Sequence, residues 1–227
     1  MVTFVLVHSL LLGPLSWAPI ARRLTAVVPS LVDVADADPP FWRWVAETVR
    51  DAIDELPPEQ PVVIVAHSNA GLLVPAIVDA SPRRVAGCVF VDASLPSPAG
   101  PTPTAPPERL EFLCSMETDG RLPQWTRWWD DPDVASLFPD AETRDAVTAE
   151  QPRLPLSYYE APVPSPAGWD DRPCAYLRFS PPYEAMARDA AQRGWAVDQV
   201  PGNHLHQLVD PDTVADRIVA LSSITGR

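Results

Sequence analysis

A serine that directly follows an apolar run has the surroundings that an enzyme nucleophile needs. Residues 62–66 are all apolar, and Ser68 stands two positions later in the sequence VAHSNAG. A sharp turn from strand to helix requires small residues near the serine, and Ala66 and Ala70 flank it at two positions on either side. Such a turn would hold the hydroxyl at the carboxyl end of a strand, beside a helix N-terminus that stabilises negative charge. The alternative is that Ser68 merely caps the following helix.

A serine hydroxyl becomes a good nucleophile only when a base removes its proton, and histidine is the usual base. His204 and His206 lie in VPGNHLHQLVDPDTVA, between the last predicted strand and the last predicted helix. That loop should open at the same edge of the sheet as Ser68. We favour His204 as the base, because His206 can simply begin the packing of the final helix. His8 and His67 are expected to be structural.

Acyl transfer also needs two N–H donors aimed at one oxygen, an oxyanion hole. The backbone N–H of Asn69, next to the serine, is one candidate. The loop VHSLLLG after the first predicted strand can supply the second donor, for which we choose the N–H of Leu10.

The elements that would position these groups alternate between strand and helix. Short Val-rich runs are typical of strands buried on both faces of a parallel sheet, and longer segments with helical spacing separate them. The pattern predicts an α/β fold with a mostly parallel, doubly wound sheet of about six strands. The predicted strands are Thr3–Val7, Ala26–Pro29, Val62–Ala66, Gly87–Asp92, Ala175–Ser180 and Val197–Val200. The predicted helices are Pro40–Leu56, Asn69–Ala80, Pro181–Arg193 and Thr213–Ser222.

The region from about 95 to 172 breaks this alternation. It holds about half of the chain's 29 prolines and many aromatic residues, too many for a disordered linker. We interpret it as a helical cap or lid insertion over one end of the sheet, within a single domain of residues 1–227. Since substrate pockets are mostly apolar, its aromatic residues are candidates for the pocket wall. They are Trp125, Trp128, Trp129, Tyr158 and Tyr159. The alternative for Trp128 and Trp129 is packing of the insertion against the sheet.

Charge and composition exclude several classes of partner. The formal net charge is −13, with 30 acidic residues against 17 Arg and no Lys, so binding of nucleic acid or of anionic membranes is not expected. No stretch approaches the roughly 20 apolar residues of a membrane span. The cysteines are odd in number and lack the spacing of a metal site, which suits a reducing cytoplasm. They are Cys88, Cys114 and Cys174.

Together these motifs carry a family resemblance. VLVHS near the start, VAHSNAG, VFVDASLP and VPGNHLHQLVDPDTVA occur in the order and at the spacings found in the α/β-hydrolase superfamily. The resemblance covers nearly all of the chain outside the insertion. It implies an α/β-hydrolase fold, a Ser-His-acid triad and a cap over the site. Ser9 departs from the pattern, because the family usually has Gly after the first His.

The acid of the implied triad is the other departure. In many members it follows the penultimate strand, but here that strand ends at Ser180, and Glu184 already lies in the next helix. Some relatives, including one group of haloalkane dehalogenases, place the acid one strand earlier, where this chain has Asp92. We therefore assign Asp92 to orient His204. Glu184 and an incomplete triad are the alternatives.

These observations predict a serine hydrolase, of the esterase or thioesterase kind, acting on a small apolar or aromatic ester, thioester or lactone without metal or organic cofactor. Ser68 would attack, His204 would move the proton, and the N–H groups of Leu10 and Asn69 would hold the oxyanion. The same triad could instead catalyse acyl transfer or a lactonising cyclisation on a biosynthetic intermediate, because this fold hosts many chemistries. A third hypothesis is a non-catalytic protein that binds a small molecule, although a binder has no need for all three triad residues.

Overall fold

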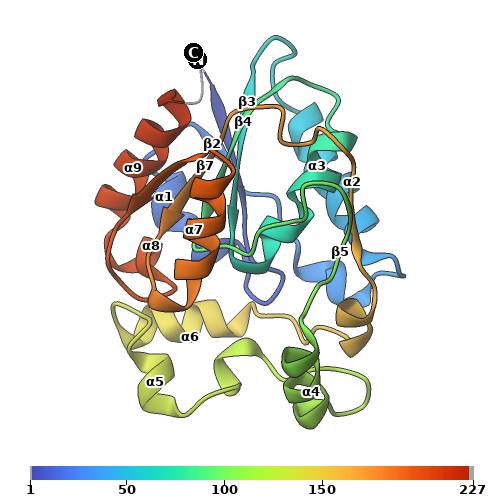
Figure 1. Cartoon of the computed structure of the whole chain (residues 1–227). Coiled ribbons are helices and arrows are strands. Elements are labelled where there is room, and N and C mark those ends of the chain that lie inside the picture. Colours follow the sequence, from blue (N-terminus) through green and yellow to red (C-terminus); the bar gives the residue numbers. More distant parts are fainter. Residues whose placement is uncertain (1, 225–227) are drawn as a thin grey trace.

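Within the part of the chain that the structure describes, six strands form one parallel sheet, as the sequence predicts. The computed structural model describes residues 2–224. In it the strands lie in the order β2-β1-β3-β4-β7-β8, and every neighbouring pair is parallel (Figure 1). Their bounds are Thr3–Val7 (β1), Ala26–Val27 (β2), Val62–His67 (β3), Val85–Val91 (β4), Cys174–Arg178 (β7) and Ala196–Gln199 (β8).

The position of each strand in the sheet follows from its residues. Strands β1 and β3 consist of buried residues throughout, as expected for apolar runs covered on both faces. At one edge, β8 alternates between half-buried and exposed residues. At the other edge, β2 is only two residues long, shorter than the predicted Ala26–Pro29, and Pro29 has no N–H with which to extend the pairing.

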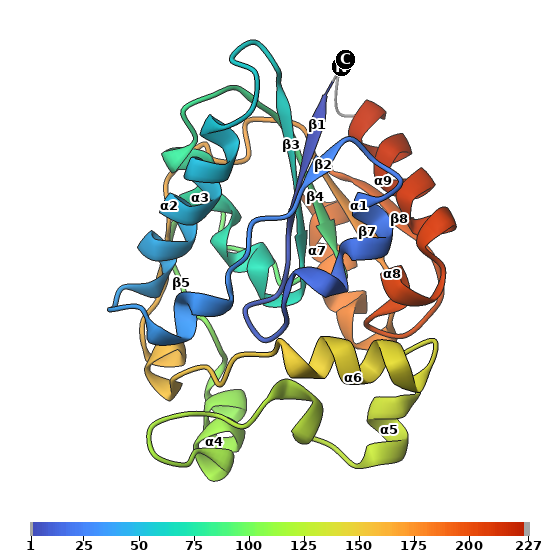
Figure 2. The same cartoon turned by 180° about the vertical axis from the view of Figure 1, so that it is seen from behind.

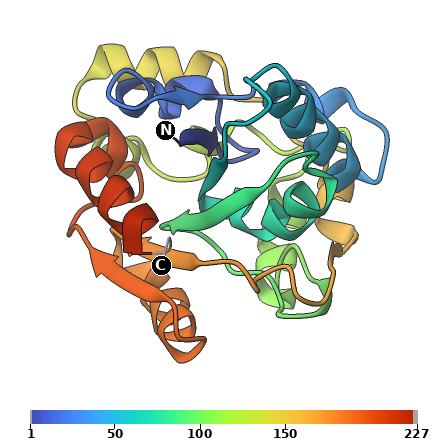
Figure 3. The same ribbon diagram turned by 90° about the horizontal axis from the view of Figure 1, so that it is seen from above.

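Helices cover both faces of the sheet. One face carries α2 (Phe41–Asp54), α3 (Val74–Ala80) and α7 (Glu184–Gln192), and the other carries α1 (Ala18–Ala21) and α9 (Pro211–Ile224) (Figures 2 and 3). The predicted helix Asn69–Ala80 divides into a 3₁₀ helix, η3 (Ser68–Leu73), followed by α3. Shorter helical turns are α8 (His206–Val209), η1 (Pro14–Ser16), η2 (Val32–Asp36) and η6 (Pro181–Tyr183). Among residues 2–224 no helix is long and apolar enough to cross a membrane.

Most of the segment between β4 and β7, including α4, α5 and α6, lies beyond the carboxyl ends of the strands (Figure 1). It contains α4 (Pro107–Met116), η4 (Trp125–Arg127), α5 (Asp131–Ala135), α6 (Ala141–Ala149) and η5 (Leu156–Glu160). Strands β5 (Gly100–Thr102) and β6 (Val163–Ser165) form a small antiparallel ribbon at its two ends. Helices α4–α6 therefore lie beyond the same sheet edge at which Ser68 follows β3.

Candidate active site

Ser68 sits in a strained turn at the end of β3. Its φ is 59°, in the left-handed region that residues other than glycine rarely adopt. Strand β3 ends at His67 and η3 begins at Ser68, so the turn has no intervening loop. The side chain lines the cavity described below, and only 8% of the residue is exposed. Strain at a single polar residue between a strand and a helix is the geometry of a nucleophile elbow.

Small neighbours make this turn possible. Ala66 and Ala70 are fully buried, as the sequence pattern requires. Gly71 is even more constrained, because a Cβ there would lie 2.2 Å from the backbone oxygen of Ser94. The Ser94 N–H in turn donates to the Ser68 carbonyl at 3.0 Å. The elbow is thus packed directly against the loop that follows β4.

A chain of hydrogen bonds connects Ser68 to a buried carboxylate. Ser68 Oγ lies 3.0 Å from His204 Nε2, and His204 Nδ1 lies 2.8 Å from Asp92 Oδ2. The side chain of His204 is 15% exposed, whereas Asp92 is completely buried. The structure thus brings together the three residues that the sequence analysis singled out. His206, the alternative base, packs edge-on against Phe179 instead.

Asp92 accepts hydrogen bonds on both carboxylate oxygens. Oδ1 accepts from the backbone N–H groups of Phe179 and Ser180, at 2.9 and 3.0 Å, and Oδ2 accepts from the Ser180 hydroxyl at 2.6 Å as well as from His204. Burial alone would raise the pKa of Asp92, but the hydrogen bonds from His204 and Ser180 outweigh it and hold that pKa below its ordinary value. The carboxylate is therefore ionised at neutral pH, ready to stabilise a positive imidazolium.

Tyr176 holds the loop that contains Asp92, whereas Glu184, the alternative acid, points to solvent. The Tyr176 hydroxyl donates to the carbonyl of Ala93 at 2.7 Å and accepts from its N–H, which pins the loop after β4. Asp92 itself has a φ of 42°. Glu184 is exposed and forms ion pairs with Arg178 and Arg188, and the partner of His204 Nδ1 is Asp92.

The remaining histidines are buried and support the backbone. His67 Nε2 lies 2.9 Å from the carbonyl oxygen of His204, and the two rings are 4.6 Å apart. Burial and the nearby His204 lower the pKa of His67 to about 3, so the neutral ring donates its N–H to that carbonyl. His8 lies between the Ser9 carbonyl and the N–H of Leu31, and burial lowers its pKa to about 4.

The expected oxyanion donors are both at the site, but one of them is engaged. The N–H of Leu10 donates to Asn69 Oδ1 at 3.0 Å, and the Ser9 hydroxyl donates to the same oxygen at 2.9 Å. Asn69 is the second residue of η3, so the helix itself offers its backbone N–H no partner. The Leu10 donor becomes available only when the Asn69 side chain moves. Ser9 and Asn69 thus tie the first loop to the elbow, a contact that the sequence analysis missed.

Tyr183 is a second group beside Ser68 that the sequence analysis missed. Its ring stacks on that of His204 with centroids 4.8 Å apart and an angle of 4°, and its hydroxyl lies 3.5 Å from His204 Nε2. Burial raises the pKa of Tyr183 to about 12, partly offset by a hydrogen bond with Ser68. The hydroxyl is therefore neutral. The only sequence signal for it is the tyrosine next to Glu184 in SPPYE.

A cavity of about 630 Å³ lies between the sheet edge and the insertion. Ser68, His204 and Asn69 are among the residues that line it. The insertion contributes apolar and aromatic residues together with two charged ones. The lining residues from the insertion are Thr104, Ala105, Pro106, Arg109, Trp125, Trp129, Asp133, Val134, Leu137 and Tyr159.

Two of the five aromatic residues expected in the pocket lie outside its wall. Trp128 is buried and donates its indole N–H to the Pro123 carbonyl at 2.9 Å, while Tyr158 packs its ring edge-on against Phe41. Both sit in the core that joins the insertion to the sheet. In the part of the chain that the structure describes, no group of His, Cys, Asp or Glu is arranged to hold a metal ion.

Comparison with known proteins identifies one family and several similar folds. The model of the alpha/beta hydrolase family matches residues 4–217. A similar solved structure is an extracellular alpha/beta-hydrolase from a Paenibacillus species, which shares structural and functional homology with tobacco salicylic acid binding protein 2. It has a TM-score of 0.74 and 17% identity, covering 97% of this chain and 99% of the other.

Two solved structures with esterase names give similar values. Polyneuridine aldehyde esterase has a TM-score of 0.73 and 17% identity, covering 98% of this chain and 99% of its own. The methylesterase MES16 from Arabidopsis has a TM-score of 0.72 and 13% identity, covering 99% of this chain and 100% of its own. At these identities the likeness shows the fold alone. No curated protein sequence matches the chain significantly.

Proposed function

Because this chain belongs to the alpha/beta hydrolase family, we propose that it is a serine hydrolase that cleaves a small apolar or aromatic ester, thioester or lactone through an acyl-enzyme. One observation carries the proposal. A serine in a strained strand-to-helix turn ends a continuous relay of hydrogen bonds, 3.0 Å and 2.8 Å long, that begins at a buried carboxylate. A helix cap needs neither the strain nor the relay.

The first half of the reaction follows from this geometry. Ser68 Oγ forms a bond to the substrate carbonyl carbon while its proton passes to His204 Nε2. Asp92, ionised and bonded to Nδ1, stabilises the imidazolium that results. The carbonyl oxygen becomes negative and accepts from the N–H groups of Leu10 and Asn69, once the Asn69 side chain has left Leu10.

The second half returns the enzyme to its starting state. The tetrahedral intermediate collapses, its bond to the leaving oxygen or sulfur breaks, and His204 gives that atom the proton it holds. Water then attacks the acyl-enzyme as His204 takes one of its protons, and Ser68 leaves with that proton. The partly exposed ring of His204 gives water a route to this position.

The lining of the cavity supports an apolar or aromatic substrate. Trp125, Trp129 and Tyr159 supply most of the aromatic wall, and a few hydroxyl groups supply polar anchors. Two of the similar structures carry the names of an esterase and a methylesterase, which favours a carboxylic ester over other acyl compounds.

The proposal can be tested with a panel of short-chain aryl and alkyl esters in ¹⁸O-labelled water. We expect acid products that carry one labelled oxygen, and no turnover by Ser68→Ala with an unchanged circular dichroism spectrum. An acyl product without the label would show transfer or cyclisation instead of hydrolysis. If no ester is turned over, or if Ser68→Ala keeps its activity, the proposal is wrong.

A further inference from the structure

The cavity is lined by a cation, Arg109 of α4, whose function the acyl-transfer chemistry does not explain. Arg109 lines the same cavity as Ser68, and among the residues that the structure describes it is the only Arg in that lining. Within residues 2–224 no carboxylate lies within ion-pair distance of its guanidinium. A protein of net charge −13 has abundant acidic side chains to pair with it. The unpaired guanidinium therefore keeps its donors available for a ligand.

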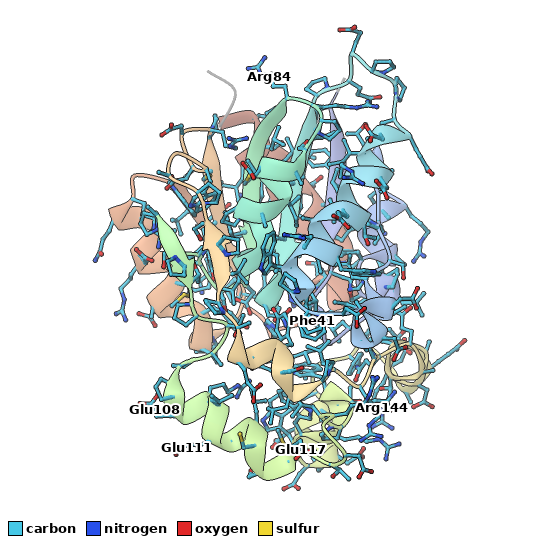
Figure 4. The ribbon with its side chains drawn as sticks, turned by 90° about the vertical axis from the view of Figure 1, so that its right-hand side faces the viewer. Phe41, Arg84, Glu108, Glu111, Glu117 and Arg144 are labelled. Atoms are coloured by element: carbon cyan, nitrogen blue, oxygen red, sulfur yellow. The ribbon has the colours of Figure 1, made fainter. Side chains whose placement is uncertain are left out.

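Aromatic side chains hold this guanidinium in place. Its central carbon lies 5.4 Å from the ring centre of Phe112 and 5.6 Å from that of Trp128. Stacking on rings leaves the N–H groups at the guanidinium edge free for a planar, bidentate partner such as a carboxylate. The nearby Glu108 and Glu111 lie on the outer side of α4, away from the body of the molecule (Figure 4). Trp128, although it does not line the cavity, thus orients a residue that does.

The positive charge of Arg109 acts on two tyrosine hydroxyl groups close to the reacting atoms. It lowers the pKa of both Tyr159 and Tyr183, against the larger effect of burial, which raises them. The hydroxyl of Tyr183 lies beside His204, and the Tyr159 hydroxyl is near the side chain of Asn69. A substrate whose ester carbonyl is at Ser68 therefore extends toward a positive charge within the same cavity.

Asp133, the other charged residue that lines the cavity, makes the cavity electrostatically asymmetric. Asp133 belongs to α5, which lies at the opposite end of the insertion from α4 (Figures 1 and 2). Asp133 repels an anion and Arg109 attracts one, so an acidic substrate is bound with its acid group toward α4.

We propose that Arg109 binds a free carboxylate on the substrate, so that the preferred substrates are apolar esters with a carboxylate elsewhere in the molecule, such as half-esters of dicarboxylic acids. The inference rests on the proposed hydrolase function and narrows its substrate class. The aromatic wall holds the apolar part, Ser68 meets the ester group, and the guanidinium donates two charge-assisted hydrogen bonds to the carboxylate.

The test compares two esters that differ in one group: monophenyl adipate, which carries a free carboxylate, and phenyl hexanoate, which does not. Release of phenol gives kcat/KM for each. In wild type we expect the acidic ester to be preferred roughly tenfold, as for a hydrogen-bonded charge pair. The Arg109→Gln variant should lose this preference through a higher KM for the acidic ester. Arg109→Lys should recover part of it.

Two controls separate binding from a general effect of charge. Arg127→Gln removes the same charge from an exposed residue of the insertion that does not line the cavity, and should keep the preference. In about 1 M NaCl, where the screening length is about 3 Å, the wild-type preference should shrink. Equal preference in wild type and Arg109→Gln, or equal losses in Arg109→Gln and Arg127→Gln, overturns the inference. If neither ester is turned over, the hydrolase function itself is refuted.

Discussion

Replacing Asp92 with Asn should remove the base function of His204 while leaving its position nearly unchanged. All four groups that contact the Asp92 carboxylate are donors. The two backbone N–H groups at Oδ1 cannot rotate, so the amide oxygen of Asn must face them. The amide nitrogen then faces His204 Nδ1 and donates to it. His204 Nδ1 must be unprotonated to accept, which puts the proton on Nε2.

A proton on Nε2 points at Ser68 Oγ and prevents His204 from taking the serine proton. The wrong tautomer of a triad histidine costs about 10⁴-fold in kcat, or roughly 5 kcal/mol of transition-state stabilisation. The fold should change little, because the Ser180 hydroxyl can rotate to accept from the new amide. The prediction is a folded protein with almost no activity.

Two neighbouring variants act as controls in the same ester assay. Ser180→Ala removes one hydrogen bond to Asp92 Oδ2 and should cost about tenfold or less. Glu184→Gln changes an exposed ion pair and should keep full activity. If Asp92→Asn keeps more than about a tenth of the wild-type kcat, or if Glu184→Gln shows the larger loss, the assignment of Asp92 is refuted.

Three further predictions follow from the same geometry. Gly71→Ala should cost about 1–3 kcal/mol in urea unfolding, because the new Cβ collides with the Ser94 backbone; a stability within error of wild type would contradict the tight contact. Tyr183→Phe keeps the ring stack but loses the hydroxyl near His204 Nε2. It should slow the hydrolysis of methyl esters roughly tenfold more than that of p-nitrophenyl esters. Equal effects on the two kinds of ester would show that the hydroxyl takes no part in the reaction. His8 and His67 stay neutral in the folded state but take up protons below about pH 6.5 when unfolded. The unfolding free energy should therefore fall by about 2 kcal/mol for each between pH 7.5 and pH 5, and a flat profile would show that their pKa values are ordinary.

The strands and their order along the chain could be predicted because buried parallel strands appear as unbroken apolar runs. All six predicted strands agree with the structure to within two residues at each end, although β2 is two residues shorter than predicted. The same reasoning predicted that Ser68 and His204 lie at one edge of the sheet, where the carboxyl ends of parallel strands meet, and the structure brings them within 3.0 Å of each other. Asp92 came from the family resemblance, and the structure places it against His204.

Contacts that depend on side-chain direction could not be predicted in this way. Trp128 and Trp129 are adjacent in sequence, and only the turn of η4 decides that Trp129 faces the cavity while Trp128 bonds to Pro123. The bond between Asn69 Oδ1 and Leu10 depends on one rotamer at the elbow. The stack of Tyr183 on His204 depends on how η6 enters the site, which no local pattern records.

The most direct test of the account is covalent labelling with a fluorophosphonate, followed by intact mass and peptide mapping. An activated serine should gain one phosphonyl group at Ser68, and Ser68→Ala should gain none. In His204→Ala the labelling rate should fall by about 100-fold or more, because the base has been removed. Labelling at another residue, or an equal rate in His204→Ala, would show that the relay from Asp92 through His204 does not activate Ser68.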